Sequence, residues 1–252
     1  MATSSEISER IVEAVMARKL APGSRLGEQQ LAMLFDCSRT IVREAMTRLA
    51  VRGIVTVSAR RGWYVVEPTE EEAQETFDAR RVIETGLIRE GRPLDKAALK
   101  RLRSHLASQQ AAIKDGDVGL RSFLLGDFHV CLAECLGNGL LAETLRDFTA
   151  RTTLVAMRYQ SAVDAAQSCG EHVKIVEALE AGELKKAEQL MAAHLRTWSK
   201  KLHMETDAPD PLAQLRLALA PMPAKAQVLH TSSPAPARRK RADRSTYLGE
   251  VL

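Results

Sequence analysis

Three histidines in the second half of the chain are the residues best suited to carry chemistry. Apolar neighbours surround each of them, His129, His172 and His194, in three separate stretches of the chain. In these stretches apolar residues recur every three or four positions, which predicts helices. Neutral imidazoles are good ligands for zinc, nickel or iron. A lone histidine on an apolar helix face is more often a core residue with satisfied ring nitrogens. The pattern alone leaves both interpretations open, a metal site and packed core histidines.

A second set of reactive side chains lies in residues 38–52, SRTIVREAMTRLAVR. At about 100° per residue, this stretch divides a helix into two halves. The apolar half comprises Ile41, Val42, Ala45, Met46 and Leu49. The other half carries Arg39, Thr40, Arg43, Glu44, Thr47 and Arg48. Arginine reaches guanine edges and phosphates, and threonine hydroxyls bond phosphate oxygens, so this face suits a DNA major groove. Taken alone, a solvated amphipathic helix would explain the same pattern.

The residues just before this stretch predict a partner helix. Gly27–Phe35 predicts a short helix with Leu31 and Leu34 turned inward. Asp36-Cys37 predicts a tight turn into Ser38, which is the expected N-cap of the next helix. A helix, a short turn and a second helix with a basic face form the arrangement of a helix-turn-helix motif.

The residues just after it predict a hairpin with a basic tip. Ile54–Ser58 and Trp63–Val66 are typical of strands, and Gly62 permits the positive φ that a tight connection needs. Arg60 and Arg61 would lie at the tip, where they could contact phosphates or enter the minor groove. A basic hairpin beside such a helix is a wing. This context favours a DNA-binding role for the polar face of residues 38–52 over a face that is merely exposed to solvent.

The remainder of the chain predicts helices almost throughout. In residues 70–204, apolar residues recur at three and four, which predicts about six helices and no strands. Ser168 and Glu171 fit a capping box, so a helix is expected to begin there with His172 in its first turn. Breaks are expected at Gly91-Arg92-Pro93, Asp115-Gly116-Asp117, Gly137-Asn138, Ser168–Glu171 and Gly182.

These patterns divide the chain into three parts and predict a mainly α fold. Residues 1–67 form a winged helix-turn-helix, and residues 68–204 an antiparallel all-helical bundle of about six helices. Pro68 ends the first part, and the acidic run after Thr69 suits the start of a helix. Residues 205–252 are rich in Ala and Pro, with too little apolar periodicity to order themselves, and predict a disordered tail.

Composition and charge agree with a globular protein that has a basic N-terminal part. Apolar residues make up 45% and charged residues 27% of the chain. Residues 1–66 hold ten Lys and Arg against six Asp and Glu, a net +4, which favours a polyanionic partner. Neither a signal peptide nor an apolar run near 18 residues is present, so a cytoplasmic protein with no membrane partner is expected. The four cysteines lack C-x-x-C spacing and are interpreted as reduced, packed thiols.

The run LAPGSRLGEQQLAMLFDCSRTIVREAMTRLAVRGIVTVSARRGWYVV resembles the DNA-binding domain of the GntR superfamily. The signature pG-x-rL-x-E-x-x-LA, then SRT-x-VREA-x-x-RL, then a G-x-V wing is nearly whole, with Ile41 where the family usually has Pro. The resemblance implies that DNA is approached by Arg25, Gln29, Ser38, Arg39, Thr40, Arg43 and Gly62. Thr47, Arg60 and Arg61 join this set through their places on the helix face and the wing.

The helical body resembles the ligand-binding domain of the FadR subclass, the all-α type called FCD. The resemblance implies a homodimer and a small carboxylate effector, often bound through a divalent metal in a cavity where the histidines converge. The residues that carry it are Arg80-x-x-x-Glu84, Asp127-Phe128-His129, Gly137-Asn138, Glu171-His172 and His194-Leu195.

One position departs from the family's metal site. The usual fourth ligand is an Asp four residues before the first histidine, and here that residue is Leu125. Asp127 is only two residues from His129 and points to nearly the opposite helix face. A metal would then have three protein ligands, open positions and no identified negative charge from the protein, so weaker metal retention and greater dependence on an anionic ligand are expected. In the alternative, the histidines bond to one another, to Arg80 or to water, and the effector binds without metal.

Further effector contacts are expected from basic and aromatic side chains of the body. Arg80 and Glu84, at i and i+4, form either an ordinary surface pair or, as the resemblance implies, an arginine turned inward toward the ligand. Arg151, Arg158 and Tyr159 are the other candidate effector contacts.

The sequence therefore predicts a ligand-responsive transcriptional regulator that acts as a repressor and has no enzyme activity. It would bind a pseudo-palindromic operator in double-stranded DNA as a homodimer, because a single recognition helix buries too little DNA for tight specific binding. Its place would be the nucleoid in the cytoplasm. Two other interpretations are an enzyme with a three-histidine metal joined to a DNA-binding head, and an architectural DNA binder without an effector.

Overall fold

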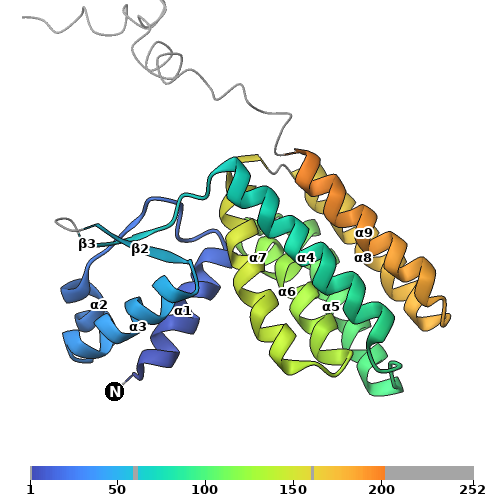
Figure 1. Cartoon of the computed structure of the whole chain (residues 1–252), viewed down its shortest axis with the longest axis horizontal. Helices are drawn as coiled ribbons and strands as arrows, with labels where there is room; N and C mark the ends of the chain where they lie inside the picture. The colour runs from blue at the N-terminus through green and yellow to red at the C-terminus, as the bar shows by residue number, and fades with distance from the viewer. Residues whose placement is uncertain (1, 59–61, 160–161, 202–252) are drawn as a thin grey trace, which may run out of the picture. The chain divides into compact units, whose positions relative to one another are not determined.

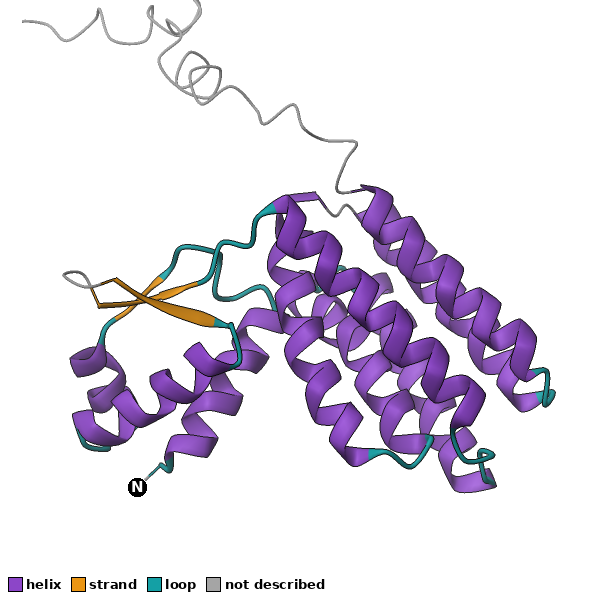
Figure 2. Cartoon of the chain, viewed as in Figure 1, coloured by secondary structure: helices purple, strands orange, loops and turns teal. Residues whose placement is uncertain are grey.

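The computed structural model describes residues 2–58, 62–159 and 162–201, which lie within one compact unit, Met1–Thr206. The order of elements is three helices interleaved with three short strands, followed by six helices (Figures 1 and 2). The first helices are α1 (Ser4–Met16), α2 (Glu28–Leu34) and α3 (Arg39–Val51), and the strands are β1 (Arg25–Leu26), β2 (Val55–Ser58) and β3 (Gly62–Val65). The mainly helical fold with an N-terminal winged helix-turn-helix is confirmed.

Helix α3 forms as its sequence pattern predicts. Ser38 is the N-cap, and its side chain accepts a hydrogen bond from the backbone N–H of Ile41 at 3.3 Å. The apolar half packs into the core, with Val42, Ala45, Met46 and Leu49 buried. The opposite half is left to solvent.

The prediction for α2 is wrong at one residue. Leu34 is 75% exposed, whereas Leu31 packs against the core and Ala32 is buried. The face that α2 turns to the core is therefore centred between Leu31 and Ala32. Leu34 lies about 200° from Ala32 around the helix, so it points to solvent.

The three strands make one antiparallel sheet in the order β1-β3-β2. The predicted hairpin is present, with Ser58 opposite Gly62, and Gly62 has a φ of 94°. β1 pairs Arg25 with Tyr64, and its two residues are too few to show an alternating pattern in the sequence. The tip residues, Arg60 and Arg61, lie outside the described residues.

The six predicted helices of the body are α4 (Glu70–Glu90), α5 (Lys96–Lys114), α6 (Val118–Cys135), α7 (Gly139–Tyr159), α8 (Ala162–Glu180) and α9 (Leu184–Lys201). Thr69 caps α4 in a full capping box with Glu72. Asn138 caps α7 by accepting from the N–H of Leu141 at 3.1 Å. The side chains of this bundle enclose one large apolar core.

The expected break at Ser168–Glu171 is wrong, because α8 runs through it. Ser168 and Cys169 are buried, and their packing outweighs the cost of about 1 kcal/mol for a glycine such as Gly170 inside a helix. The carboxylate of Glu171 is also engaged elsewhere, with Gln167 one turn earlier and with His194 on α9. It therefore makes no capping box with Ser168.

Helix α7 contacts the N-terminal elements as well as the bundle. Ala150 and Leu154 of α7 belong to the core cluster of α1 and α3. Arg52, the C-cap of α3, pairs with Glu9 of α1 at 2.9 Å and with Asp147 of α7 at 2.6 Å.

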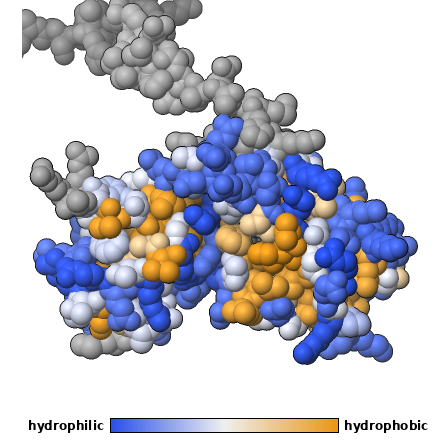
Figure 3. All heavy atoms as spheres, viewed as in Figure 1, coloured by the Kyte–Doolittle hydropathy of each residue, from blue (hydrophilic) through white to orange (hydrophobic). Residues whose placement is uncertain are grey.

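The surface of the bundle carries an apolar strip along α4 (Figure 3). Val82 on α4 is 65% exposed and Leu140 at the start of α7 is 75% exposed. A groove of about 390 Å³ runs beside them, and its apolar lining comprises Val82, Ile83, Gly86, Leu87, Leu136 and Leu141. Within the described residues, every helix is too short or too polar to cross a membrane.

Candidate functional site

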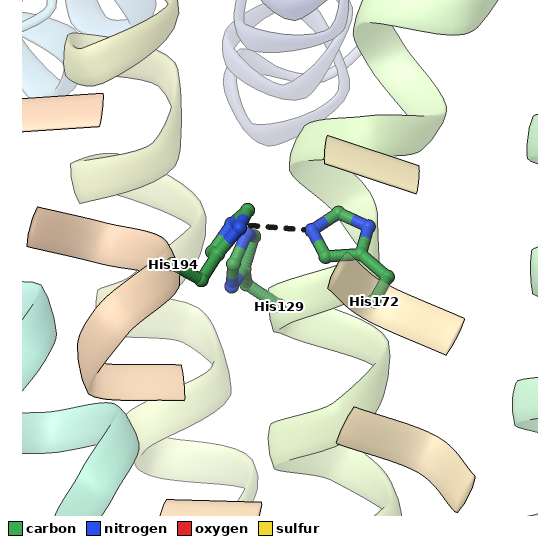
Figure 4. A group of neighbouring side chains, drawn as sticks. All are labelled: His129, His172 and His194. Carbon is green, nitrogen blue, oxygen red and sulfur yellow. Dashed lines mark hydrogen bonds between the residues drawn. The ribbon is translucent and has the colours of Figure 1, made fainter. Parts of the chain in front are cut away.

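The three predicted histidines meet in the middle of the bundle. His129 comes from α6, His172 from α8 and His194 from α9, and Figure 4 shows the three rings turned toward one another. One ring nitrogen from each lies within 4.8 Å of the others, and the Nε2 atoms of His172 and His194 are 3.3 Å apart. All three side chains are buried. Side chains from three helices thus converge on one point, as the sequence analysis expected.

Carboxylates hold the outer nitrogens of two of the histidines. His129 Nδ1 lies 2.5 Å from Glu84 Oε2, and His194 Nδ1 lies 2.7 Å from Glu171 Oε2. An ionised carboxylate only accepts hydrogen bonds, so each Nδ1 must carry the proton and donate it. When a ring carries that proton alone, its Nε2 atom has a lone pair directed into the bundle.

The third histidine has an amide in the same place. His172 Nδ1 lies 3.0 Å from Gln109 Oε1, and with the amide turned in this direction Nδ1 donates and Nε2 also carries a lone pair. The Nε2 atoms of His172 and His194 lie within hydrogen-bond distance (dashed line in Figure 4), and with both protons on Nδ1 their lone pairs face each other. Two opposed lone pairs repel, and a cation placed between them would remove that repulsion.

Burial favours the neutral form of two of the histidines. Burial lowers the pKa of His129 to about 4 and holds the pKa of His172 well below its usual value. Burial by itself would raise the pKa of Glu84, but the adjacent His129 and Arg80 outweigh it and hold that pKa at about 2. The Arg80 guanidinium stays charged at neutral pH, so it is the permanent positive partner of the Glu84 carboxylate.

Arg80 is buried beside this site and is not a surface residue. Its Nε donates to Glu84 Oε1 at 2.9 Å, and its Nη1 donates to Thr152 Oγ1 at 2.8 Å. The interpretation of Arg80 and Glu84 as a surface pair is wrong, because the two side chains are 5% and 3% exposed. Among the described residues, Nη2 of Arg80 has no hydrogen-bond partner although it is buried. A buried guanidinium nitrogen without an acceptor is costly, and an anionic ligand would supply one.

The expectation that the protein brings no negative charge to the histidines is wrong. Glu84 and Glu171 both bring a negative charge to the histidines, through their hydrogen bonds with Nδ1 of His129 and His194. These roles were not predicted, because the spacing of Glu84 pairs it with Arg80 and the spacing of Glu171 from Ser168 fits a helix cap. The neighbouring His172 and the position of Glu84 one turn after Arg80 were the available signals.

Other expected contacts lie elsewhere. The guanidinium of Arg151 sits against Gly53 after α3, where a Cβ would be 2.9 Å from its Cζ, so Arg151 is not at the histidines. The side chains of Arg158 and Tyr159 lie outside the described residues. Leu125 packs with Ala165 and Cys169 in a small apolar cluster.

Asp127 is directed away from the histidine cluster, as expected from its spacing. Its carboxylate lies 3.2 Å from His105 Nε2 and 3.9 Å from Arg146. Cys131 and Cys135 are part of the packing of the bundle core, in line with their interpretation as structural thiols.

The residues expected at DNA belong to the N-terminal part of the chain. The described members are all exposed: Arg25, Gln29, Ser38, Arg39, Thr40, Arg43, Thr47 and Gly62. The side chains of Arg39 and Arg43 are 63% and 61% exposed. A residue that the sequence analysis did not single out, Glu28 of α2, holds both of them.

Glu28 links the two arginines to the wing. Its carboxylate accepts from Arg43 Nη2 at 2.8 Å, from Arg39 Nη2 at 3.0 Å and from Trp63 Nε1 at 3.2 Å. Hydrogen bonds from Arg43, then Arg39 and Trp63, lower the pKa of Glu28 to about 2. The charged carboxylate therefore fixes the positions of both guanidinium groups before any DNA is present.

Two domain families match the chain in the order of these elements. Residues 3–65 match the bacterial regulatory proteins of the gntR family, and residues 75–197 match the FCD domain. The chain is a transcriptional regulator of the GntR type with an FCD domain. The first match covers the helix-turn-helix and wing, and the second covers the helices that carry the three histidines.

Relatives of this GntR-type regulator agree with that assignment. It is 28% identical to the HTH-type transcriptional regulator LutR of Bacillus subtilis, covering 70% of this chain and 90% of LutR. It is 24% identical to the Uxu operon transcriptional regulator of Escherichia coli, covering 78% of this chain and 85% of the relative. A solved GntR regulator from Rhodococcus sp. RHA1 has the same fold, with a TM-score of 0.70, 24% identity, and coverage of 79% of this chain and 97% of that one.

Proposed function

We propose that the regulator represses transcription by binding operator DNA as a homodimer, and that a small carboxylate, bound with a divalent metal, controls this binding. The observation that carries the effector part is the meeting of three imidazole lone pairs beside a buried, unpartnered nitrogen of Arg80. The regulator names of its relatives support a regulatory role without enzyme activity. Binding to chromosomal DNA would place the protein at the nucleoid.

The boundaries of the parts remain those proposed from the sequence. Residues 1–67 would be the DNA-binding domain and residues 68–204 the effector-binding and dimerisation domain. The proposed tail, residues 205–252, lies outside the described residues.

The DNA-binding part of the proposal rests on the exposed face of α3. Arg43 stands near the middle of this face and is held by Glu28. Arg43→Ala should weaken specific operator binding by about 1–3 kcal/mol if the side chain contacts a base. Binding is measured by titration of labelled operator in matched salt. Arg103→Ala, which removes the same charge from the exposed surface of α5, should leave operator affinity unchanged, and equal losses in both variants would contradict the assignment.

The proposed dimer would use the apolar strip on α4. Val82 and Leu140 are exposed there beside an apolar groove, and a second copy of the chain would bury them. A two-fold dimer would present two α3 helices to the two halves of an operator.

A divalent metal fits the donor set at the histidines. The three Nε2 atoms would hold it, and zinc, nickel and iron all accept imidazole nitrogen. The Nε2 atoms of His172 and His194 are 3.3 Å apart, close to the roughly 3.3 Å between two ligands of a tetrahedral zinc. All three donor atoms lie within 4.8 Å of one another, so His129 would complete the set by a small approach. When bound, the metal would supply a Lewis-acidic centre for a ligand oxygen. The chain itself contributes the Arg80 donor that would hold a carboxylate.

The effector proposal is tested by thermal unfolding with candidate small carboxylates. In the presence of zinc, the correct carboxylate should raise the melting temperature, because a ligand at 100 times its Kd stabilises the folded state by about 2.7 kcal/mol. Arg80→Lys keeps the charge but loses the planar donor fork, so this rise should shrink at equal carboxylate concentration. Arg81→Lys, on the exposed side of the same helix, is the matched control. A rise that persists in excess chelator would contradict the metal and favour a metal-free pocket.

A further inference from the structure

The hydrogen bond at His172 differs in kind from those of the other two histidines. His129 and His194 face carboxylates, which can only accept. His172 faces the side-chain amide of Gln109, which presents an oxygen or an NH₂ group according to how it is turned. The amide alone therefore does not determine which nitrogen of His172 carries the proton.

Two more side chains fix the direction of that amide. Gln109 Nε2 lies 3.0 Å from His105 Nδ1, and His105 Nε2 lies 3.2 Å from Asp127 Oδ2. The Asp127 carboxylate accepts, so Nε2 of His105 carries a proton, and in the singly protonated ring Nδ1 is an acceptor. His105 then attracts the NH₂ group of Gln109, and the carbonyl oxygen of Gln109 is turned toward His172.

We infer that Asp127, His105 and Gln109 form a positioning chain that sets the tautomer of His172 and leaves its Nε2 free for a metal. Gln109 is completely buried, and it lies one helical turn after His105 on α5, so the two side chains share a face. Asp127 reaches His105 from α6, on the opposite side from His129. Without this chain, His172 could hold its proton on Nε2 and would then be unable to bind a cation.

This inference rests on the proposed metal, and it identifies the side chains that prepare the third ligand, His172, for binding. Outer hydrogen-bond partners of metal-bound histidines typically change metal affinity by about 10–100-fold when they are removed. Asp127 was excluded as a ligand by its spacing from His129. In the positioning chain it acts on the site from the far side of His105, without touching the metal.

The tautomer is measured directly in the metal-free full chain. Long-range ¹H–¹⁵N correlations of the imidazole rings distinguish a protonated from an unprotonated nitrogen. In the wild-type protein, Nε2 of His172 should be unprotonated. In Gln109→Met, which removes the acceptor, a protonated Nε2 should appear. Gln109→Glu retains an acceptor and should keep the wild-type tautomer.

Zinc affinity is measured on the same proteins by competition with a chromophoric chelator. Gln109→Met should bind zinc about 10–100-fold more weakly than the wild type, and Gln109→Glu within about 3-fold of it. Gln110→Met, at the exposed neighbouring position on α5, is the control for the substitution itself. It should change neither the tautomer nor the affinity.

The results separate this inference from the proposed function. An Nε2–H in wild-type His172, or an unchanged tautomer in Gln109→Met, would overturn the inference whatever zinc does. His105→Phe should yield both tautomers of His172, and an unchanged spectrum would overturn the part assigned to His105 and Asp127. A wild-type protein with the expected tautomer but no zinc binding would contradict the proposed metal and leave the positioning chain supported.

Discussion

Replacing Glu84 with alanine is expected to lower the free energy of unfolding by about 3–5 kcal/mol. The Glu84 carboxylate is 3% exposed and accepts from two buried donors, Arg80 Nε and His129 Nδ1. Its removal leaves the Arg80 guanidinium buried with an uncompensated charge and with two nitrogens short of an acceptor. The effect is measured by urea unfolding of chelator-treated protein, so that loss of a metal does not add to it.

A matched pair on the same helix provides the control. Asp78 and Arg81 form an ion pair on the surface of α4, with side chains 52% and 35% exposed. Asp78→Ala should cost less than about 0.5 kcal/mol, because exposed pairs contribute little. Glu84→Gln keeps the shape and one acceptor but not the charge, so its cost should lie between the two. A loss under about 1 kcal/mol in Glu84→Ala would mean that Arg80 finds another partner or reaches solvent.

Helix α3 could be predicted from its sequence because its signal is local. The division of residues 38–52 into apolar and polar halves, together with the Ser38 cap, corresponds to what α3 buries and exposes. β1 was missed, since its two residues acquire strand structure only by pairing with β3. Leu34 was misplaced because a helix of seven residues can turn either of two adjacent faces to the core.

The surroundings of the histidines could not be predicted, because they depend on contacts between helices distant in sequence. Arg80 and Glu84 have the spacing of a surface pair, and the packing of α4 against α9, α7 and α6 buries them. Glu171 was assigned to a helix cap because Ser168 precedes it by three residues, which is the spacing of a capping box. Its contact with His194 arises from the packing of α8 against α9.

The second large effect is expected at the metal. Purified without chelators or a histidine tag, the wild-type protein should hold about one divalent ion per chain, and His172→Ala should hold almost none. Among the described residues, His172 is one of three candidate ligands, and Leu125 offers none. Two neutral nitrogens would remain, and the affinity should fall by more than about 100-fold, beyond the range seen for outer partners.

Metal content is measured by elemental analysis and checked by unfolding. Because a metal stabilises only the state that binds it, chelator should lower the melting temperature of the wild type and leave that of His172→Ala unchanged. Cys135→Ser is the control, since this thiol packs in the core and is not directed at the histidines. The negative charges of Glu84 and Glu171 strengthen the donor nitrogens of His129 and His194, so a metal should be retained even without a fourth protein ligand. Equal metal content in His172→Ala and the wild type would place the ion elsewhere, and an empty wild type would favour histidines that bind the effector alone.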